Sequence, residues 1–164
     1  MSQIMRRLFL MLGATLQVAS VFCLISPAVV PDVRNKVMGS LDSGKPVVLI
    51  VARAATKADK ESEAYGDWSS YLNDFAADNR DRFTFVTIIP VETKQIFSAI
   101  TPIKHSFAVI FLKNDHEALY YDGMILDPET YKYASDYLVG HESTVDRSAR
   151  TLKPFTFKLI NNKP

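Results

Sequence analysis

The polar residues able to do chemistry are few, and none forms a complete metal-binding set. Three histidines occur, at 105, 116 and 141, and no two of them are close enough to make a ligand pair such as H-x-x-x-H. Asp115-His116-Glu117 combines ligand types, but it falls in a predicted hairpin turn, where polar side chains are expected. We therefore expect a solvated turn there, and the sequence predicts no metal ligand.

Catalytic signatures are equally sparse. A serine hydrolase needs its nucleophile beside a base. Ser106 follows His105 directly, but neighbours on an extended strand point to opposite faces, so this pair is not expected to act together. There is no Gly-x-Ser-x-Gly, P-loop or Gly-x-Gly-x-x-Gly sequence, and the scattered acids form no acid–base pair. The sequence therefore predicts no catalytic residue and no cofactor.

The first 28 residues look like a targeting segment. Arg6 and Arg7 precede an apolar run from Leu8 to Leu24, and Ser26-Pro27-Ala28 supplies small residues, as in a secretory signal peptide. The apolar stretch 8–30 is also long enough to span a bilayer. We therefore expect residues 1–28 to be either a cleaved signal peptide or a retained membrane anchor, the chain's one expected contact with a membrane. Both alternatives place the remainder in the periplasm or outside the cell, because the positive charges precede the segment.

The charge balance and the cysteine content argue against two classes of function, nucleic-acid binding and thiol chemistry. Removing residues 1–28 takes two arginines from the 19 basic residues, which leaves 17 against 18 acidic residues. A nucleic-acid binder would usually carry a basic excess, so no nucleic-acid partner is expected. The single cysteine, Cys23, lies in the leader. If the leader is removed after Ala28, no disulfide, thiol nucleophile or cysteine-bound metal is possible.

The rest of the chain alternates helical and extended patterns. In the first half of the chain, apolar spacing, capping residues and helix-breaking residues predict a helix from Pro31-Asp32 to Gly44, a strand 47–51, a polar loop 52–66 with or without a first helical turn, and a helix opened by Asp67 and ending near Asn79. A strand 82–89, a helix 91–100 and a hairpin of strands 107–112 and 117–121 are predicted next. The last predicted elements are a helix from Asp127-Pro128 to Val139 closed by Gly140, a loose stretch 141–153, and an edge strand or docked tail at 153–160. Crossover helices imply parallel pairing and the hairpin adds antiparallel pairing. The expected fold is an α/β sandwich with a mixed sheet.

This order resembles the thioredoxin-like fold. Gly44-Lys45-Pro46, at the end of a helix, runs into an apolar strand, as in periplasmic thioredoxin-like domains. The run from Phe107 to Asp115 resembles the strand and turn that follow the family's cis-proline. The resemblance covers roughly residues 31–140 and implies a thioredoxin-like domain there, with residues 141–164 as a C-terminal tail.

The chain departs from this family at both parts of its redox site. The family's Cys-x-x-Cys pair aligns with Lys57 and Lys60, and an ammonium group cannot replace a thiolate. Phe107 stands where the family has its cis-proline, and Pro102 lies five residues earlier. A cis bond before a non-proline residue costs about 3 kcal/mol, so we expect a trans bond at Phe107. The resemblance therefore implies a redox-inactive member.

Aromatic residues favour protein binding over catalysis. Five tyrosines crowd the last hairpin and helix, at 120, 121, 131, 133 and 137, and they cannot all point into the core. Exposed tyrosine suits protein interfaces, although each one taken singly is more simply a core residue with its hydroxyl at the rim. Trp68 heads an apolar helical stripe and is expected in the core. The leading expectation is an exported, redox-inactive domain that binds another envelope or secreted protein or serves as a module of an envelope assembly. The alternative is a non-thiol enzyme of unknown class on the same scaffold.

Overall fold

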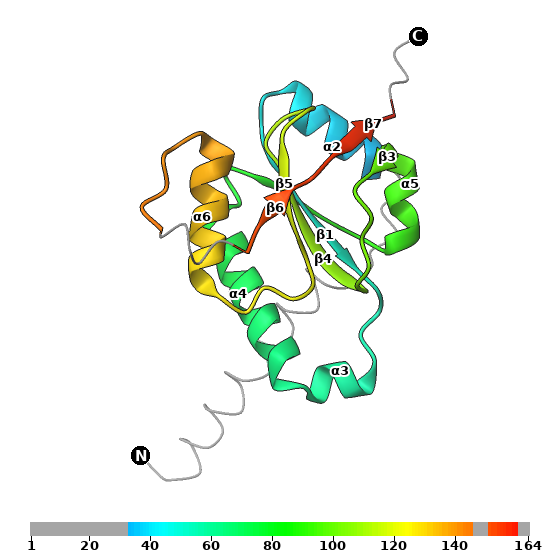
Figure 1. The fold of residues 1–164 in the computed structure, drawn as a ribbon, viewed down its shortest axis with the longest axis vertical. Coiled ribbons are helices and arrows are strands. Elements are labelled where there is room, and N and C mark those ends of the chain that lie inside the picture. Colours follow the sequence, from blue (N-terminus) through cyan, green and yellow to red (C-terminus); the bar gives the residue numbers. More distant parts are fainter. Residues whose placement is uncertain (1–32, 146–150, 161–164) are drawn as a thin grey trace, which may run out of the picture.

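The structure, a computed structural model, describes residues 33–145 and 151–160, so the expected leader lies outside the described residues. The chain forms a mixed sheet with helices on both faces (Figure 1). Its elements are α2 (Val33–Asp42), β1 (Val47–Ala52), α3 (Lys57–Glu61), α4 (Glu63–Asn79), β2 (Thr84–Ile88), the 3-10 turn η1 (Pro90–Glu92), α5 (Thr93–Ile96), β3 (Phe97–Ile100), β4 (Phe107–Leu112), β5 (Ala118–Asp122), α6 (Pro128–Val139), β6 (Lys153–Pro154) and β7 (Phe157–Leu159).

The main sheet has the strand order β2-β1-β4-β5-β6. β1 runs parallel to β2 and antiparallel to β4, and β5 returns antiparallel to β4. Every residue of β1 and β4 is buried, as expected for central strands covered on both faces. These pairings confirm the predicted mixed α/β class and the predicted hairpin.

Alternate residues of β1 supply two cores, one on each side of the sheet. Val48 and Ile50 face a core that α4 and α6 close. Val47 and Leu49 face a second core, which is closed by α2, α5 and the small sheet formed by β3 and β7. Figure 1 shows α4 and α6 on one side of the strands and α2 and α5 on the other. The period-two side-chain alternation of a strand thus divides the apolar residues between two layers.

The predicted end of α2 and both predicted boundaries of α6 are confirmed, whereas the predicted start of α2 at Pro31-Asp32 lies outside the described residues. Gly44 follows α2 with φ 75°, and Gly140 ends α6 with φ 74°, which is the left-handed conformation that favours glycine. Asp127 caps α6, since its carboxylate accepts a hydrogen bond from the Glu129 N–H at 3.0 Å. Pro128 occupies the first helical position, where its missing N–H costs nothing.

The prediction that Asp67 opens a helix was wrong. α4 begins at Glu63, and Tyr65, already inside the helix, is 8% exposed. A separate short helix, α3, precedes it and buries no residue. Exposed helical turns made of polar residues show no apolar periodicity. The apolar spacing therefore indicated the later part of α4 but neither α3 nor the start of α4.

The single helix predicted over 91–100 was also wrong. Pro90 starts a 3-10 turn, α5 is four residues long, and residues 97–100 form β3. β3 pairs antiparallel with β7, so that Phe97 lies opposite Leu159. That pairing partner lies about sixty residues further along the chain, and local apolar spacing cannot reveal it.

Residues 153–160 form both strands of the C-terminal segment. β6 pairs with β5 at the edge of the main sheet, and β7 pairs with β3. Between these strands, the Phe155 N–H donates to the Ala118 carbonyl at 2.9 Å, and the Phe155 side chain is 4% exposed. Among the described residues, no helix is both long and apolar enough to cross a membrane.

Candidate functional site

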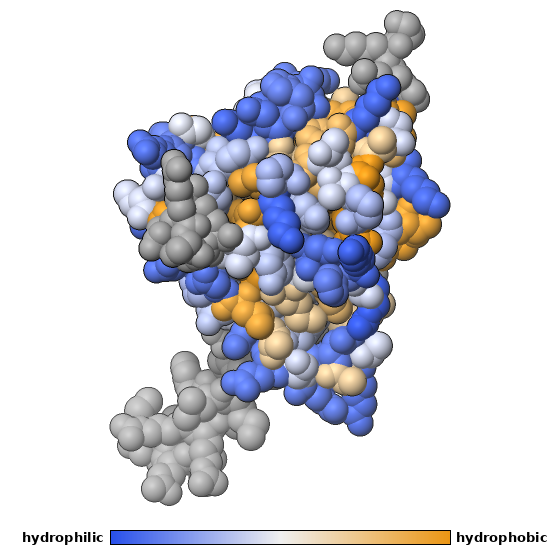
Figure 2. Space-filling view, viewed as in Figure 1, coloured by the Kyte–Doolittle hydropathy of each residue, from blue (hydrophilic) through white to orange (hydrophobic). Residues whose placement is uncertain are grey.

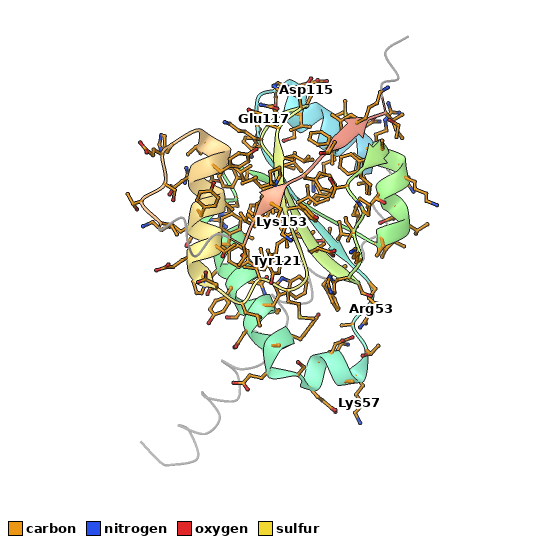
Figure 3. The ribbon with its side chains drawn as sticks, viewed as in Figure 1. Arg53, Lys57, Asp115, Glu117, Tyr121 and Lys153 are labelled. Atoms are coloured by element: carbon orange, nitrogen blue, oxygen red, sulfur yellow. The ribbon has the colours of Figure 1, made fainter. Side chains whose placement is uncertain are left out.

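Two pairs of interacting polar side chains lie at one end of the main sheet, where β1 and β5 end and β4 begins. Arg53 follows β1 directly (Figure 3) and pairs with Asp59, while Asp122 ends β5 and pairs with His105. The Arg53 N–H donates to the Ser106 carbonyl at 3.0 Å, which joins the two segments. We call this end of the sheet, with residues 53–61, 104–107 and Asp122, the Arg53 end.

Arg53 and Asp59 form a bidentate ion pair. The Arg53 Nη1 and Nη2 atoms lie 2.5 and 2.9 Å from the two carboxylate oxygens of Asp59. Thr56 adds its backbone N–H and its hydroxyl, each 2.7 Å from Asp59 Oδ2, and its hydroxyl oxygen accepts from the Asp59 N–H. Two of these contacts, from the Thr56 N–H to Asp59 Oδ2 and from the Asp59 N–H to the Thr56 hydroxyl, form a capping box that starts α3. A single carboxylate therefore fixes both the arginine and the first turn of the helix.

Aromatic rings support the Arg53 side chain. The guanidinium carbon lies 4.9 Å from the centre of the Phe107 ring, a cation–π distance. Phe107 in turn packs edge-on against Trp68 at 5.2 Å and Tyr65 at 5.9 Å between ring centres. The peptide bond before Phe107 is trans, as predicted. The first residue of β4 is thus an aromatic side chain in the core.

The electrostatics follow these contacts. The hydrogen bonds from Arg53, with those from Thr56, hold the pKa of Asp59 well below its usual range. The same hydrogen bond to Asp59 raises the pKa of Arg53. Burial raises the pKa of Tyr65, and the Asp59 charge adds to that increase. All three groups therefore keep their ordinary charge at neutral pH.

Asp122 holds the segment before β4 in place. Its two oxygens accept the backbone N–H groups of Lys104 and His105, both at 2.9 Å, and His105 Nδ1 lies 3.2 Å from Oδ1. Burial acts to raise the pKa of Asp122, but the hydrogen bonds outweigh it, and the pKa lies below its usual value. The Asp122 side chain is 16% exposed and that of His105 is 65% exposed. The imidazole is therefore oriented by a carboxylate while most of the ring faces solvent.

The two lysines of α3 lie on the surface. Lys57 and Lys60 both lie on α3, and the Lys57 side chain is 90% exposed with its Nζ 3.7 Å from Glu61. An i,i+4 pair at such exposure contributes little to stability. Lys57 and Lys60 therefore place ammonium groups on the exposed surface of α3.

The hairpin residues form the predicted solvated turn. The Asn114 side-chain oxygen accepts the N–H groups of His116 and Glu117, at 3.0 and 2.7 Å. His116 Nδ1 lies 2.6 Å from Asp115, and both side chains are about three-quarters exposed. His141 is exposed after α6. Within the described ranges, no three His, Cys, Asp or Glu residues are grouped so that they could hold a metal ion.

The tyrosines divide between core and surface, as predicted. Tyr131 is 4% exposed, whereas the others, at 120, 121, 133 and 137, are half-buried. Trp68 is fully buried, which confirms its expected place in the core. Figure 2 shows that hydrophobic residues also reach the surface around β3 and β7. The surface is therefore mixed, with aromatic and aliphatic groups among polar ones.

Sequence reasoning missed the Arg53 and Asp122 contacts. One signal was present: Thr56 and Asp59 have the spacing of a capping box, S/T-x-x-E, with Asp in place of Glu. Nothing local pointed to Asp122, because its partners lie 17 and 18 residues away. Comparison of the chain with protein-family models, curated proteins and solved structures found no match.

Proposed function

We propose that this chain is an exported thioredoxin-like domain without redox activity that acts by binding another envelope or secreted protein. The observation that carries the proposal is the strand order β2-β1-β4-β5, with β4 antiparallel to β1 and two helices on one face. This is the strand order expected for a thioredoxin-like sheet. In the segment after β1, where the thiols of that family would lie, this chain has the Arg53–Asp59 ion pair.

The surface at that place supports binding rather than thiol exchange. Disulfide exchange requires a thiolate, and the one cysteine of the chain, Cys23, is in the expected leader. The Arg53 end instead offers an oriented arginine and exposed lysines. Arginine is enriched among the residues that dominate protein–protein binding energies.

Two measurements test this proposal. The purified protein is expected to reduce insulin disulfides no faster than the buffer control, and a rate comparable with that of an active thioredoxin would overturn the redox-inactive assignment. Affinity capture from the envelope fraction of the source cells is expected to retain a defined partner in constant stoichiometry. Recovery of the chain alone, across detergents and salt concentrations, would refute the binding role.

One observation favours a second candidate, a non-thiol enzyme. The contact between His105 Nδ1 and Asp122 is the arrangement that orients a catalytic imidazole and leaves Nε2 to act as a base. Activated esters such as p-nitrophenyl acetate test this directly. Turnover that is catalytic in protein and lost in His105→Gln, but kept in His116→Gln, would establish the enzyme. Equal rates in the two variants would remove this candidate.

A further inference from the structure

Arg53 uses only part of its hydrogen-bonding capacity. A guanidinium carries five N–H groups in a planar fork. Nη1 donates to Asp59 and to the Ala54 carbonyl, and Nη2 donates once, to Asp59. Within residues 33–145 and 151–160, Nε and the second N–H of Nη2 donate to no residue. These two donors share one edge of the guanidinium, the edge on which a carboxylate can bind side-on.

The unused edge belongs to a side chain that is already oriented. Asp59 and the Ala54 carbonyl fix the plane of the guanidinium, and the Phe107 ring lies 4.9 Å from its carbon. The Arg53 side chain is nevertheless 38% exposed, so a ligand can reach it from solvent. An oriented fork loses less conformational entropy on binding than a mobile arginine does.

The charged side chains exposed around Arg53 are mostly basic. The acidic side chains of Asp59 and Asp122 are each only 16% exposed, and both are engaged in hydrogen bonds. The exposed residues of this end include three lysines, at 57, 60 and 104, and one acid, Glu61, which is 66% exposed and pairs with Lys57. The Arg53 end therefore presents net positive charge to solvent.

We propose that the Arg53 end is a docking surface for an acidic segment of a partner protein, with the Nε/Nη2 edge of Arg53 as the anchor for a carboxylate. Asp59 acts as the positioning residue that holds the fork, and the exposed lysines attract further acidic side chains. Bidentate arginine–carboxylate bonds are among the stronger polar contacts. This inference rests on the proposed function, because it names the chemistry of the bound partner.

The test is a titration of the ¹⁵N-labelled chain with an acetylated, amidated hexaglutamate peptide, followed by NMR. The Arg53 Nε–H resonance is expected to shift together with the Lys104 and His105 amides, and raising the salt concentration should weaken binding. Arg53→Lys keeps the charge but loses the fork, so it is expected to lower the affinity about tenfold or more. Lys113→Gln, at the opposite end of β4, is the matched control and should change the affinity by less than about twofold.

The outcomes separate this inference from the proposed function. The double substitution Lys57→Gln and Lys104→Gln leaves Arg53 and its ion pair intact, and it should also weaken peptide binding. The inference is overturned if the peptide does not bind, or if Arg53→Lys and Lys113→Gln weaken it equally. A natural partner that is still captured by Arg53→Lys would overturn this docking surface while leaving the binding role in place.

Discussion

Replacing Phe107 by alanine tests whether the aromatic side chain at the start of β4 supports the Arg53 end. Phe107 is 5% exposed, and its ring contacts the rings of Trp68 and Tyr65 and the guanidinium of Arg53. Truncating a buried phenylalanine loses its burial energy and leaves a cavity, which together cost about 3–5 kcal/mol. For a domain of this size, that loss corresponds to a fall in the melting temperature of roughly 10–20 °C.

The assay follows from the single tryptophan. Trp68 is fully buried and lies 5.2 Å from the Phe107 ring, so its fluorescence reports unfolding in urea. The unfolding midpoint of Phe107→Ala should fall with little change in the slope, because the surface exposed on unfolding stays the same. Phe107→Leu keeps most of the apolar volume and should cost less than about 1.5 kcal/mol.

A surface control and a clear failure criterion complete this experiment. Val91 is 62% exposed, and Val91→Ala is expected to change the free energy of unfolding by no more than about 0.5 kcal/mol. The reasoning is refuted if Phe107→Ala costs less than about 1 kcal/mol, or if Phe107→Leu costs as much as Phe107→Ala. Either result would mean that the ring does not fill the space between β4 and α4.

Three further predictions concern charge and backbone conformation. Because the pKa of Asp122 is lowered in the folded protein, its carboxylate stabilises the fold at pH values above the unfolded-state pKa near 4. This stabilisation is lost as the pH falls through the folded-state pKa. Below about pH 4, the melting temperature of the wild type should therefore drop more steeply than that of Asp122→Asn. Asp59→Ala should speed hydrogen exchange of the α3 amides without lowering the global melting temperature by more than a few degrees, because α3 buries no residue, whereas Lys57→Gln should leave exchange unchanged. Gly140→Ala should cost about 1–2 kcal/mol in urea unfolding, since φ is 74° and an added Cβ meets nothing within 4 Å. Gly39→Ala, inside α2 and equally uncrowded, should instead stabilise the protein by up to about 1 kcal/mol.

The elements that the sequence predicted well are those whose signals are local. The apolar runs of β1 and β4 and the caps at Asp127 and Gly140 depend on residues a few positions apart. The start of α4 was missed because the preceding turns are exposed and lack apolar periodicity. β3 was mistaken for helix because its partner strand, β7, is distant in the chain.

The candidate site was harder to predict than the fold. The sequence marked Lys57, Lys60 and Phe107 as departures from the thioredoxin-like pattern that it resembles elsewhere, and the structure places all three at the Arg53 end. The sequence did not show that Asp59 and Asp122 turn inward. Hydrogen bonds between distant segments decide which carboxylates face the protein and which charges face solvent. These contacts cannot be inferred from composition.

The position of β6 and β7 has a consequence for biosynthesis. The last described segment of the chain closes the second core with Phe155 and Leu159, and it supplies β3 with its pairing partner. A nascent chain ending before residue 151 would leave β3 unpaired and one face of the sheet incompletely covered. The second core can therefore be completed only after residues 151–160 have been synthesised.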